Sequence, residues 1–216
     1  MIPNMKIASR LIVQLLSILC ALASIVPAQA YVVNLAPAPR AIYLQVGTGG
    51  AVACGGGTIA GGGVPSNSAV INEVSVTVPA ANVGAGVQAM ASGSPVANSL
   101  YDNFVFCTLA TQVYVAGFLR SPVAGAAGTL TATSPANLTS GALNLSFNQI
   151  SWASGGNGDA VATIPSGTFV AGATQTIYTA TQNTWFESCL SFSYANNTVV
   201  AAGTYTGRVT YTLSSP

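Results

Sequence analysis

The stretch that most constrains the fold is residues 203–213, near the C-terminus, because its side chains alternate in character along its length. One parity is apolar, with Tyr205, Val209, Tyr211 and Leu213. The other parity holds four threonines and Arg208. Successive side chains of a strand point to opposite faces, so one face would be apolar and the other a row of hydroxyl groups. β-branched and aromatic residues suit a half-buried pleated surface, and no helix has this period. The pattern predicts the closing strand of a β-sandwich.

Further short strands are predicted along most of the chain. The clearest are residues 41–46, 68–78, 112–119 and 185–194, with further candidates at 104–107, 128–133, 143–152, 160–165, 168–171 and 175–180. Glycine- and proline-containing turns separate them about every 8 to 12 residues, and no amphipathic helix is evident after residue 30. This is the signature of a sandwich or barrel. We predict an all-β chain with one antiparallel, immunoglobulin-like β-sandwich of about ten short strands over residues 31–216.

Residues 1–30 are predicted to be a cleaved export signal. Lys6 and Arg10 precede an apolar run over residues 11–26, and Ala28-Gln29-Ala30 fits the small-x-small rule for cleavage. The apolar run is short for a membrane span, which favours removal over anchoring. The mature chain would begin at Tyr31 and pass through the periplasm to the cell surface or the extracellular space.

The chain beyond residue 30 is poor in charge. It has no lysine and no histidine, and its ionised side chains are Arg40, Arg120, Arg208, Glu73, Asp102, Asp159 and Glu187. Soluble domains usually carry about 25% charged residues, whereas this chain has 4%. A net charge near zero favours association, and the apolar content excludes an intrinsically disordered chain. Three isolated arginines do not form a basic patch, so no nucleic-acid partner is predicted.

The residue inventory also argues against catalysis. An acyl-transfer nucleophile needs a neighbouring base, usually histidine or lysine, and a zinc site needs cysteine or histidine in larger numbers. The four acids are scattered along the sequence, so a glycosidase pair is disfavoured. The glycine-rich residues 47–63 lack the Lys-Ser/Thr ending of a phosphate loop, and residues 156–159 offer one acid, which indicates a turn and not a calcium site. No enzymatic activity, metal or cofactor is predicted.

The C-terminal stretch is similar to a known family. Gly-Thr-Tyr-Thr-Gly-Arg-Val-Thr-Tyr-Thr-Leu, residues 203–213, resembles the last strand of chaperone–usher pilus subunits, particularly their spore-coat-U-like and archaic pilin relatives. The chain departs from the pattern at its end, Ser214-Ser215-Pro216, where those pilins often carry a penultimate aromatic residue. The resemblance is firm over residues 202–213.

This resemblance implies a secreted, structural or adhesive subunit of a fimbrium, or pilus, that assembles by β-strand addition. Tyr205, Val209, Tyr211 and Leu213 would then line the apolar side of the assembly groove. The implied partners are copies of the chain or related subunits, a periplasmic chaperone and an outer-membrane usher. In such a subunit an N-terminal extension enters the next subunit's groove. Pro37 and Pro39 interrupt the corresponding residues 31–46, which favours the other interpretation, that these residues begin this sandwich.

Three cysteines remain after the predicted cleavage, and export implies an oxidising compartment in which a disulfide forms. Cys54, Cys107 and Cys189 allow three single pairings, and the residues alone do not choose among them. The resemblance to pilins favours Cys54–Cys107. Cys189 would then be a small buried residue or, less favoured, an intermolecular bridge.

The alternative function, from a different class, is a monomeric β-sandwich module on the cell surface that binds a carbohydrate or another ligand. Its aromatic side chains would stack on the ligand: Tyr101, Tyr114, Trp152 and Trp185. Packing in the hydrophobic core is the simpler role for the same residues.

Overall fold

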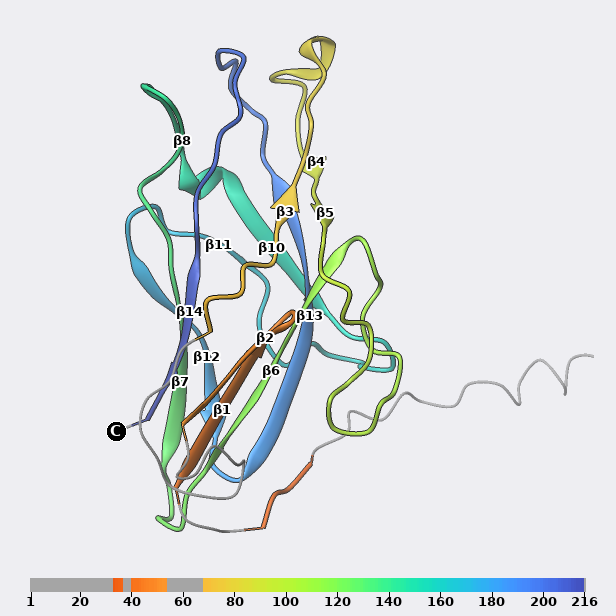
Figure 1. Cartoon of the computed structure of the whole chain (residues 1–216), viewed down its shortest axis with the longest axis vertical. Coiled ribbons are helices and arrows are strands. Elements are labelled where there is room, and N and C mark those ends of the chain that lie inside the picture. Colours follow the sequence, from red (N-terminus) through yellow and green to blue (C-terminus); the bar gives the residue numbers. More distant parts are fainter. Residues whose placement is uncertain (1–32, 37–39, 54–67, 216) are drawn as a thin grey trace, which may run out of the picture.

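The computed structural model describes residues 33–36, 40–53 and 68–215, and the predicted signal peptide lies outside them. The described chain is all-β, as predicted, and consists of antiparallel strands with two single-turn 3₁₀ helices, Ala80–Asn82 and Phe147–Gln149 (Figure 1). No helix within these described ranges is long and apolar enough to cross a membrane.

The larger of two main sheets has seven strands. Their order is β11 (Gly167–Thr168), β10 (Ile150–Gly155), β13 (Thr184–Tyr194), β6 (Gln112–Arg120), β1 (Ala41–Val46) and β2 (Gly49–Ala53), and β4 (Gln88–Ala89) also pairs with β13. Strands β13 and β6 form its centre: β6 carries a long apolar run, whereas in β13 buried residues such as Phe186, Leu190 and Phe192 are interspersed with polar ones. All seven inner residues of β6 are buried, as expected for a strand covered on both faces.

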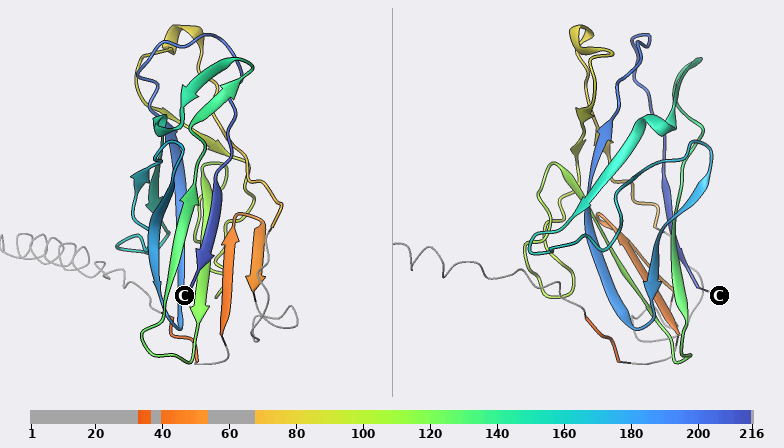
Figure 2. Two further views of the ribbon diagram at one scale, coloured as in Figure 1. Left: turned by 90° about the vertical axis from the view of Figure 1, so that its left-hand side faces the viewer. Right: turned by 180° about the vertical axis from the view of Figure 1, so that it is seen from behind.

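The second sheet has three strands in the order β12 (Thr174–Thr181), β7 (Ala127–Thr133) and β14 (Thr210–Ser214). In the left view of Figure 2, β7 lies between its two partners, which are the edges of this sheet. Two small two-stranded sheets complete the described strands: β3 (Val74–Ser75) with β5 (Ala91–Ser92), and β8 (Asn137–Ser140) with β9 (Leu143–Ser146).

The hydrophobic core lies between the two main sheets. Leu130 and Ala132 of β7 and Ile177 of β12 share one buried cluster with Trp152 and Leu190 of the larger sheet. Alternation in β7 explains this, since its even-numbered residues 128, 130 and 132 are buried while its threonines face away. Two sheets packed over a common core form a β-sandwich arrangement.

Several predicted strands are confirmed, and others are wrong or shorter than predicted. Strands β1, β6 and β13 match the predicted residues 41–46, 112–119 and 185–194. Of residues 68–78 only Val74–Ser75 pairs as a strand, and residues 104–107 form no strand, since Val105 makes one isolated bridge to Asn98. Part of the predicted glycine-rich loop, Gly49–Ala53, is strand β2.

Candidate functional site

Strand β14 forms the C-terminal edge of the three-stranded sheet. Its residues pair with β7 in antiparallel register, from Thr210 opposite Thr133 to Ser214 opposite Thr129. Further upstream, Thr206 forms an isolated bridge with Thr139. The predicted strand over residues 203–213 is therefore regular only at its C-terminal half. Among the strands of the described residues, β7 is the one that β14 pairs with.

The alternation predicted for this stretch is present. Its four apolar side chains are partly buried and pack against the main core cluster: Tyr205, Val209, Tyr211 and Leu213. Arg208 and the threonines at 204, 206, 210 and 212 are exposed. Burial raises the pKa of the Tyr211 hydroxyl above its ordinary value. An apolar face at a sheet edge that is covered only in part can bury more surface if another strand is added.

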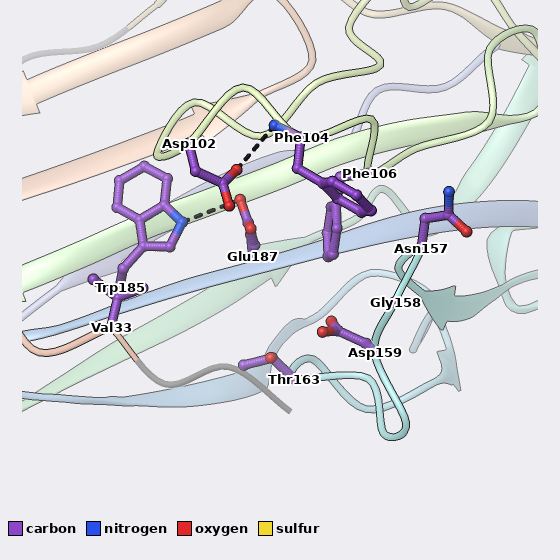
Figure 3. A pocket seen from close by; sticks show the side chains of 10 residues that line it. All are labelled: Val33, Asp102, Phe104, Phe106, Asn157, Gly158, Asp159, Thr163, Trp185 and Glu187. Carbon is purple, nitrogen blue, oxygen red and sulfur yellow. Dashed lines mark hydrogen bonds between the residues drawn. The ribbon is translucent and has the colours of Figure 1, made fainter. Parts of the chain in front are cut away.

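A pocket of about 250 Å³ lies beside the first half of β13. It is on the face of the larger sheet that points away from the three-stranded sheet. It is lined by Val33, Asp102, Phe104, Phe106, Asn157, Gly158, Asp159, Thr163, Trp185 and Glu187 (Figure 3). Three of the chain's four acids are in this set, which contains no lysine, arginine or histidine. These acids are scattered along the sequence, and the fold brings three of them to one pocket.

Glu187 is fixed at the centre of this group by neutral donors. Its Oε2 accepts hydrogen bonds from Tyr114 Oη at 2.6 Å, Ser99 Oγ at 2.9 Å and Trp185 Nε1 at 3.1 Å. Burial, followed by the hydrogen bond to Glu187, raises the pKa of the Tyr114 hydroxyl above its ordinary value. Hydrogen bonds from neutral groups satisfy this carboxylate and leave its negative charge uncompensated.

Asp159 and Asp102 reach the pocket from two different loops. Burial, and then the charge of Glu187, raise the pKa of the Asp159 carboxyl above its ordinary value. Asp102 is exposed and accepts a hydrogen bond from the Phe104 amide at 2.9 Å. The three acids are not arranged for a metal ion, since no group of three or more potential ligands in the described chain lies close enough to hold one. The pocket therefore has excess negative charge without a metal-binding geometry.

The predicted turn at residues 156–159 is confirmed, and it supplies one wall of this pocket. The Asp159 amide donates to the Gly156 carbonyl at 3.2 Å, and Gly158 has a φ of +86°. Positive φ values suit glycine because it has no Cβ. The turn is joined to the facing loop where the Asn157 amide donates to the Phe106 carbonyl at 2.8 Å. Nothing in the order of these residues along the chain indicates that contact.

The four aromatic residues of the alternative binding function separate into two pairs. Tyr114 and Trp152 are buried in the core, with 0% and 5% of their surface exposed. Trp185 lines the pocket, and Tyr101, which is 45% exposed, contacts it with ring centroids 6.2 Å apart. The core role is therefore correct for the first pair, whereas in the second pair Trp185 is partly buried in the pocket wall and Tyr101 is exposed beside it.

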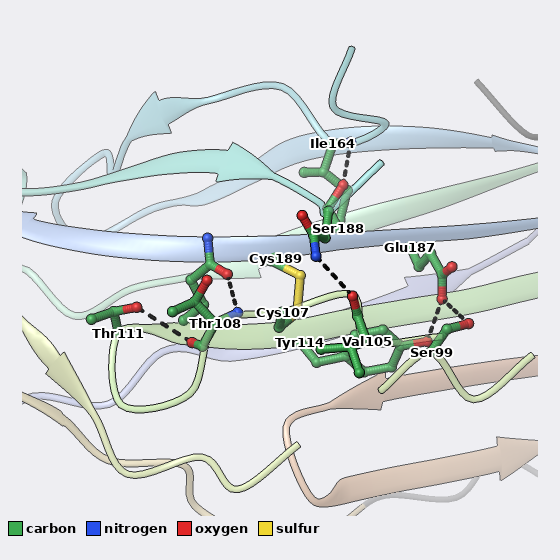
Figure 4. The surroundings of a disulfide bond; sticks show 12 residues. Ser99, Val105, Cys107, Thr108, Thr111, Tyr114, Ile164, Glu187, Ser188 and Cys189 are labelled. Atoms are coloured by element: carbon green, nitrogen blue, oxygen red, sulfur yellow. Dashed lines mark hydrogen bonds between the residues drawn. A yellow bond between two sulfur atoms is a disulfide. The ribbon is translucent and has the colours of Figure 1, made fainter. Parts of the chain in front are cut away.

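The disulfide in the structure joins Cys107 to Cys189, so the predicted Cys54–Cys107 pairing is wrong (Figure 4). Cys107 lies in the loop before β6 and Cys189 in β13, and these two strands are neighbours in the sheet. Their Cα atoms are 5.5 Å apart, within the range that a disulfide bridges. Both sulfur-bearing residues are buried beside Tyr114. Cys54 lies outside the described residues.

The N-terminal residues that the structure describes belong to this sandwich, as one of the two interpretations predicted. Ala41–Val46 forms β1 between β2 and β6. Upstream of it, the Leu35 amide donates to the Asn183 carbonyl at 2.7 Å, and the Trp185 amide donates to the Val33 carbonyl at 3.1 Å. The segment around Asn34 therefore lies antiparallel to the start of β13, opposite Thr184.

Comparisons of the chain with protein-family models, with curated proteins and with solved structures found no match.

Proposed function

We propose that this chain is an exported, pilin-like structural subunit of the cell surface that assembles by addition of a β-strand at the edge of the sheet that β14 forms. The observation that carries the proposal is the combination in β14 of a side that pairs with no other strand of the described residues and an apolar face that the core covers only in part. An added strand would gain main-chain hydrogen bonds and would bury alternate apolar side chains. The low charge of the chain supports association further, since few charges oppose edge-to-edge pairing.

The donated strand is expected to come from a second copy of the chain. The described part of the N-terminal stretch is engaged in its own sandwich, so donating it would break the Leu35 and Trp185 hydrogen bonds noted above. Each main-chain hydrogen bond contributes about 0.5–1.5 kcal/mol net. Releasing the N-terminal stretch therefore costs free energy, but the cost is small. A pairing of edge strands between two copies requires no such release.

We predict that charges placed on β14 prevent assembly. In the purified mature chain, Thr210→Lys combined with Thr212→Lys is expected to convert oligomers into monomers in size-exclusion chromatography with light scattering. Both threonines are exposed, so the folded subunit tolerates the change, whereas lysines on an edge strand oppose pairing.

The matched control places the same two charges on the other edge of the same sheet. Thr174→Lys with Thr176→Lys, on the exposed face of β12, is expected to leave the oligomers intact. Loss of oligomers in both variants, or a wild-type chain that is a monomer at all concentrations, contradicts assembly through β14. A monomer would favour the alternative function, a ligand-binding module.

A further inference from the structure

Accessible aromatic side chains gather at the pocket beside β13. Trp185 forms part of its wall, and Phe104, in the loop before β6, lines it while remaining half-exposed. Tyr101 contacts Trp185 and is also exposed. Large apolar side chains that stay exposed as a group, and not singly, mark a surface that binds a ligand or partner. Flat aromatic groups in a concave site offer apolar surface to a small ligand.

The loop that carries Phe104 is held in place by its contacts with the rest of the sandwich. At its end, the disulfide between Cys107 and Cys189 ties it to β13. On its other side, Asn157 of the facing turn donates from its side-chain Nδ2 to the Val105 carbonyl at 3.1 Å. A ligand that enters a preformed pocket does not have to order the pocket's walls, so less binding free energy is lost.

The acceptor oxygens of the pocket are spread around it and do not converge on one point. Asp102, Asp159 and Glu187 reach it from three separate segments (Figure 3), and they are not grouped closely enough to hold one metal ion. All three hydrogen bonds that Glu187 accepts within the described chain fall on Oε2. Its Oε1 is therefore left for a ligand. Separated acceptors match a ligand that carries several hydroxyl groups, because each hydroxyl donates one hydrogen bond.

The charge and the size of the pocket restrict the ligand further. The arginines that the structure describes do not line it, and the sequence after residue 30 has no lysine or histidine. An anionic ligand would therefore meet like charge with no compensating cation. A wholly apolar ligand would strip water from the carboxylates without replacing their hydrogen bonds, which costs free energy. The volume of about 250 Å³ is below the roughly 300–1,000 Å³ of sites for drug-sized molecules, so the ligand is small.

We propose that this pocket binds one ring of a neutral saccharide. The C–H face of the ring would pack against Trp185 and Phe104, and its hydroxyl groups would donate to Asp159 and to Oε1 of Glu187. The pocket lies on the face of the larger sheet that points away from the three-stranded sheet, so a strand added at β14 would not cover it. The site requires no assembly, but a polymer of subunits would present many copies of it, and copies that engage one surface together bind it more tightly.

The test is a titration of the purified mature chain with single sugars, followed by ligand-observed NMR. The probes are the methyl glycosides of glucose, galactose, mannose, N-acetylglucosamine and N-acetylgalactosamine, with methyl glucuronide as the anionic counterpart of the glucoside. At least one neutral glycoside is expected to bind with a dissociation constant in the millimolar range, as suits a ligand of one ring. The glucuronide is expected to bind at least about tenfold more weakly than the glucoside, because its carboxylate meets the like charge of the pocket.

Two variants, each with a matched control, locate the site. Phe104→Ala removes an exposed aromatic wall and is expected to weaken binding about tenfold, whereas Leu109→Ala, at an exposed apolar residue that does not line the pocket, is expected to leave the affinity unchanged. Asp159→Asn removes a charged acceptor and is expected to weaken binding about tenfold, whereas Glu73→Gln, at the one acid outside the pocket after residue 30, is expected to have no effect. Circular dichroism would verify that each variant folds.

The proposal is overturned if none of the five neutral glycosides binds, if the glucuronide binds as tightly as the glucoside, or if the pocket variants behave like their controls. Assembly is tested separately. The chain with Thr210→Lys and Thr212→Lys is expected to bind the glycoside with unchanged affinity, since β14 does not line the pocket. Sugar binding and assembly through β14 can therefore fail independently of each other.

Discussion

Replacing both disulfide cysteines, in Cys107→Ala with Cys189→Ala, is expected to lower the free energy of unfolding by about 4–5 kcal/mol on the chain-entropy account. The bond closes a loop with a sequence separation of 82, and the entropy that a crosslink removes from the unfolded chain grows with the length of that loop. A loss of this size is comparable to the total stability of many single domains. Denaturant unfolding followed by tryptophan fluorescence would measure it.

Peptide mapping identifies the bond independently of stability. Trypsin cleaves after arginine, and Arg40, Arg120 and Arg208 are the cleavage sites of the mature chain. Cys54 and Cys107 both lie in the fragment 41–120, whereas Cys189 lies in 121–208. A Cys107–Cys189 bond therefore holds the two fragments together without reductant, and Cys54→Ala should leave both this link and the stability unchanged. Two fragments that separate without reductant would show that the bond lies elsewhere.

Gly117→Ala is expected to destabilise the fold by about 3 kcal/mol, the upper part of the range for overpacking a core. Gly117 lies in β6 between β1 and β13. A Cβ at this position would press against the backbone carbonyl of Tyr43 and lie 2.9 Å from Cζ of Phe186. Neither neighbour can move without shifting β1 or the core. A drop in the denaturant midpoint at an unchanged m-value would report this loss.

Gly155→Ala is the matched control, since this glycine also lies in the larger sheet, at the end of β10. A Cβ there would meet no atom within 4 Å. The free energy of unfolding is expected to stay within about 0.5 kcal/mol of the wild-type value. Equal stability of the two alanine variants would contradict the inference that β6 packs closely against Tyr43 and Phe186 at Gly117.

Local sequence was sufficient to predict a strand and its two faces where apolar and polar side chains alternate along that strand. The inward and outward sides of residues 203–213 follow from the order of apolar residues and threonines, because the side chains of a strand alternate whatever lies beside it. The apolar run over residues 112–119 likewise indicated a central strand. Residues 104–107 looked equally apolar, but Phe104 is 52% exposed and Val105 56%, so this loop lies at the rim of the pocket and not in a sheet.

The order of the residues along the chain thus determined that the protein is all-β and which side of its last strand faces the core. Only the tertiary structure decided the partner of Cys107, the place of β14 at the edge of the three-stranded sheet and the meeting of Asp102, Asp159 and Glu187 at one pocket. The physical reason is that alternation acts between neighbours in sequence, whereas disulfides, sheet edges and charge clusters depend on distances between segments far apart in the chain. Those distances are set by how the two sheets pair and pack.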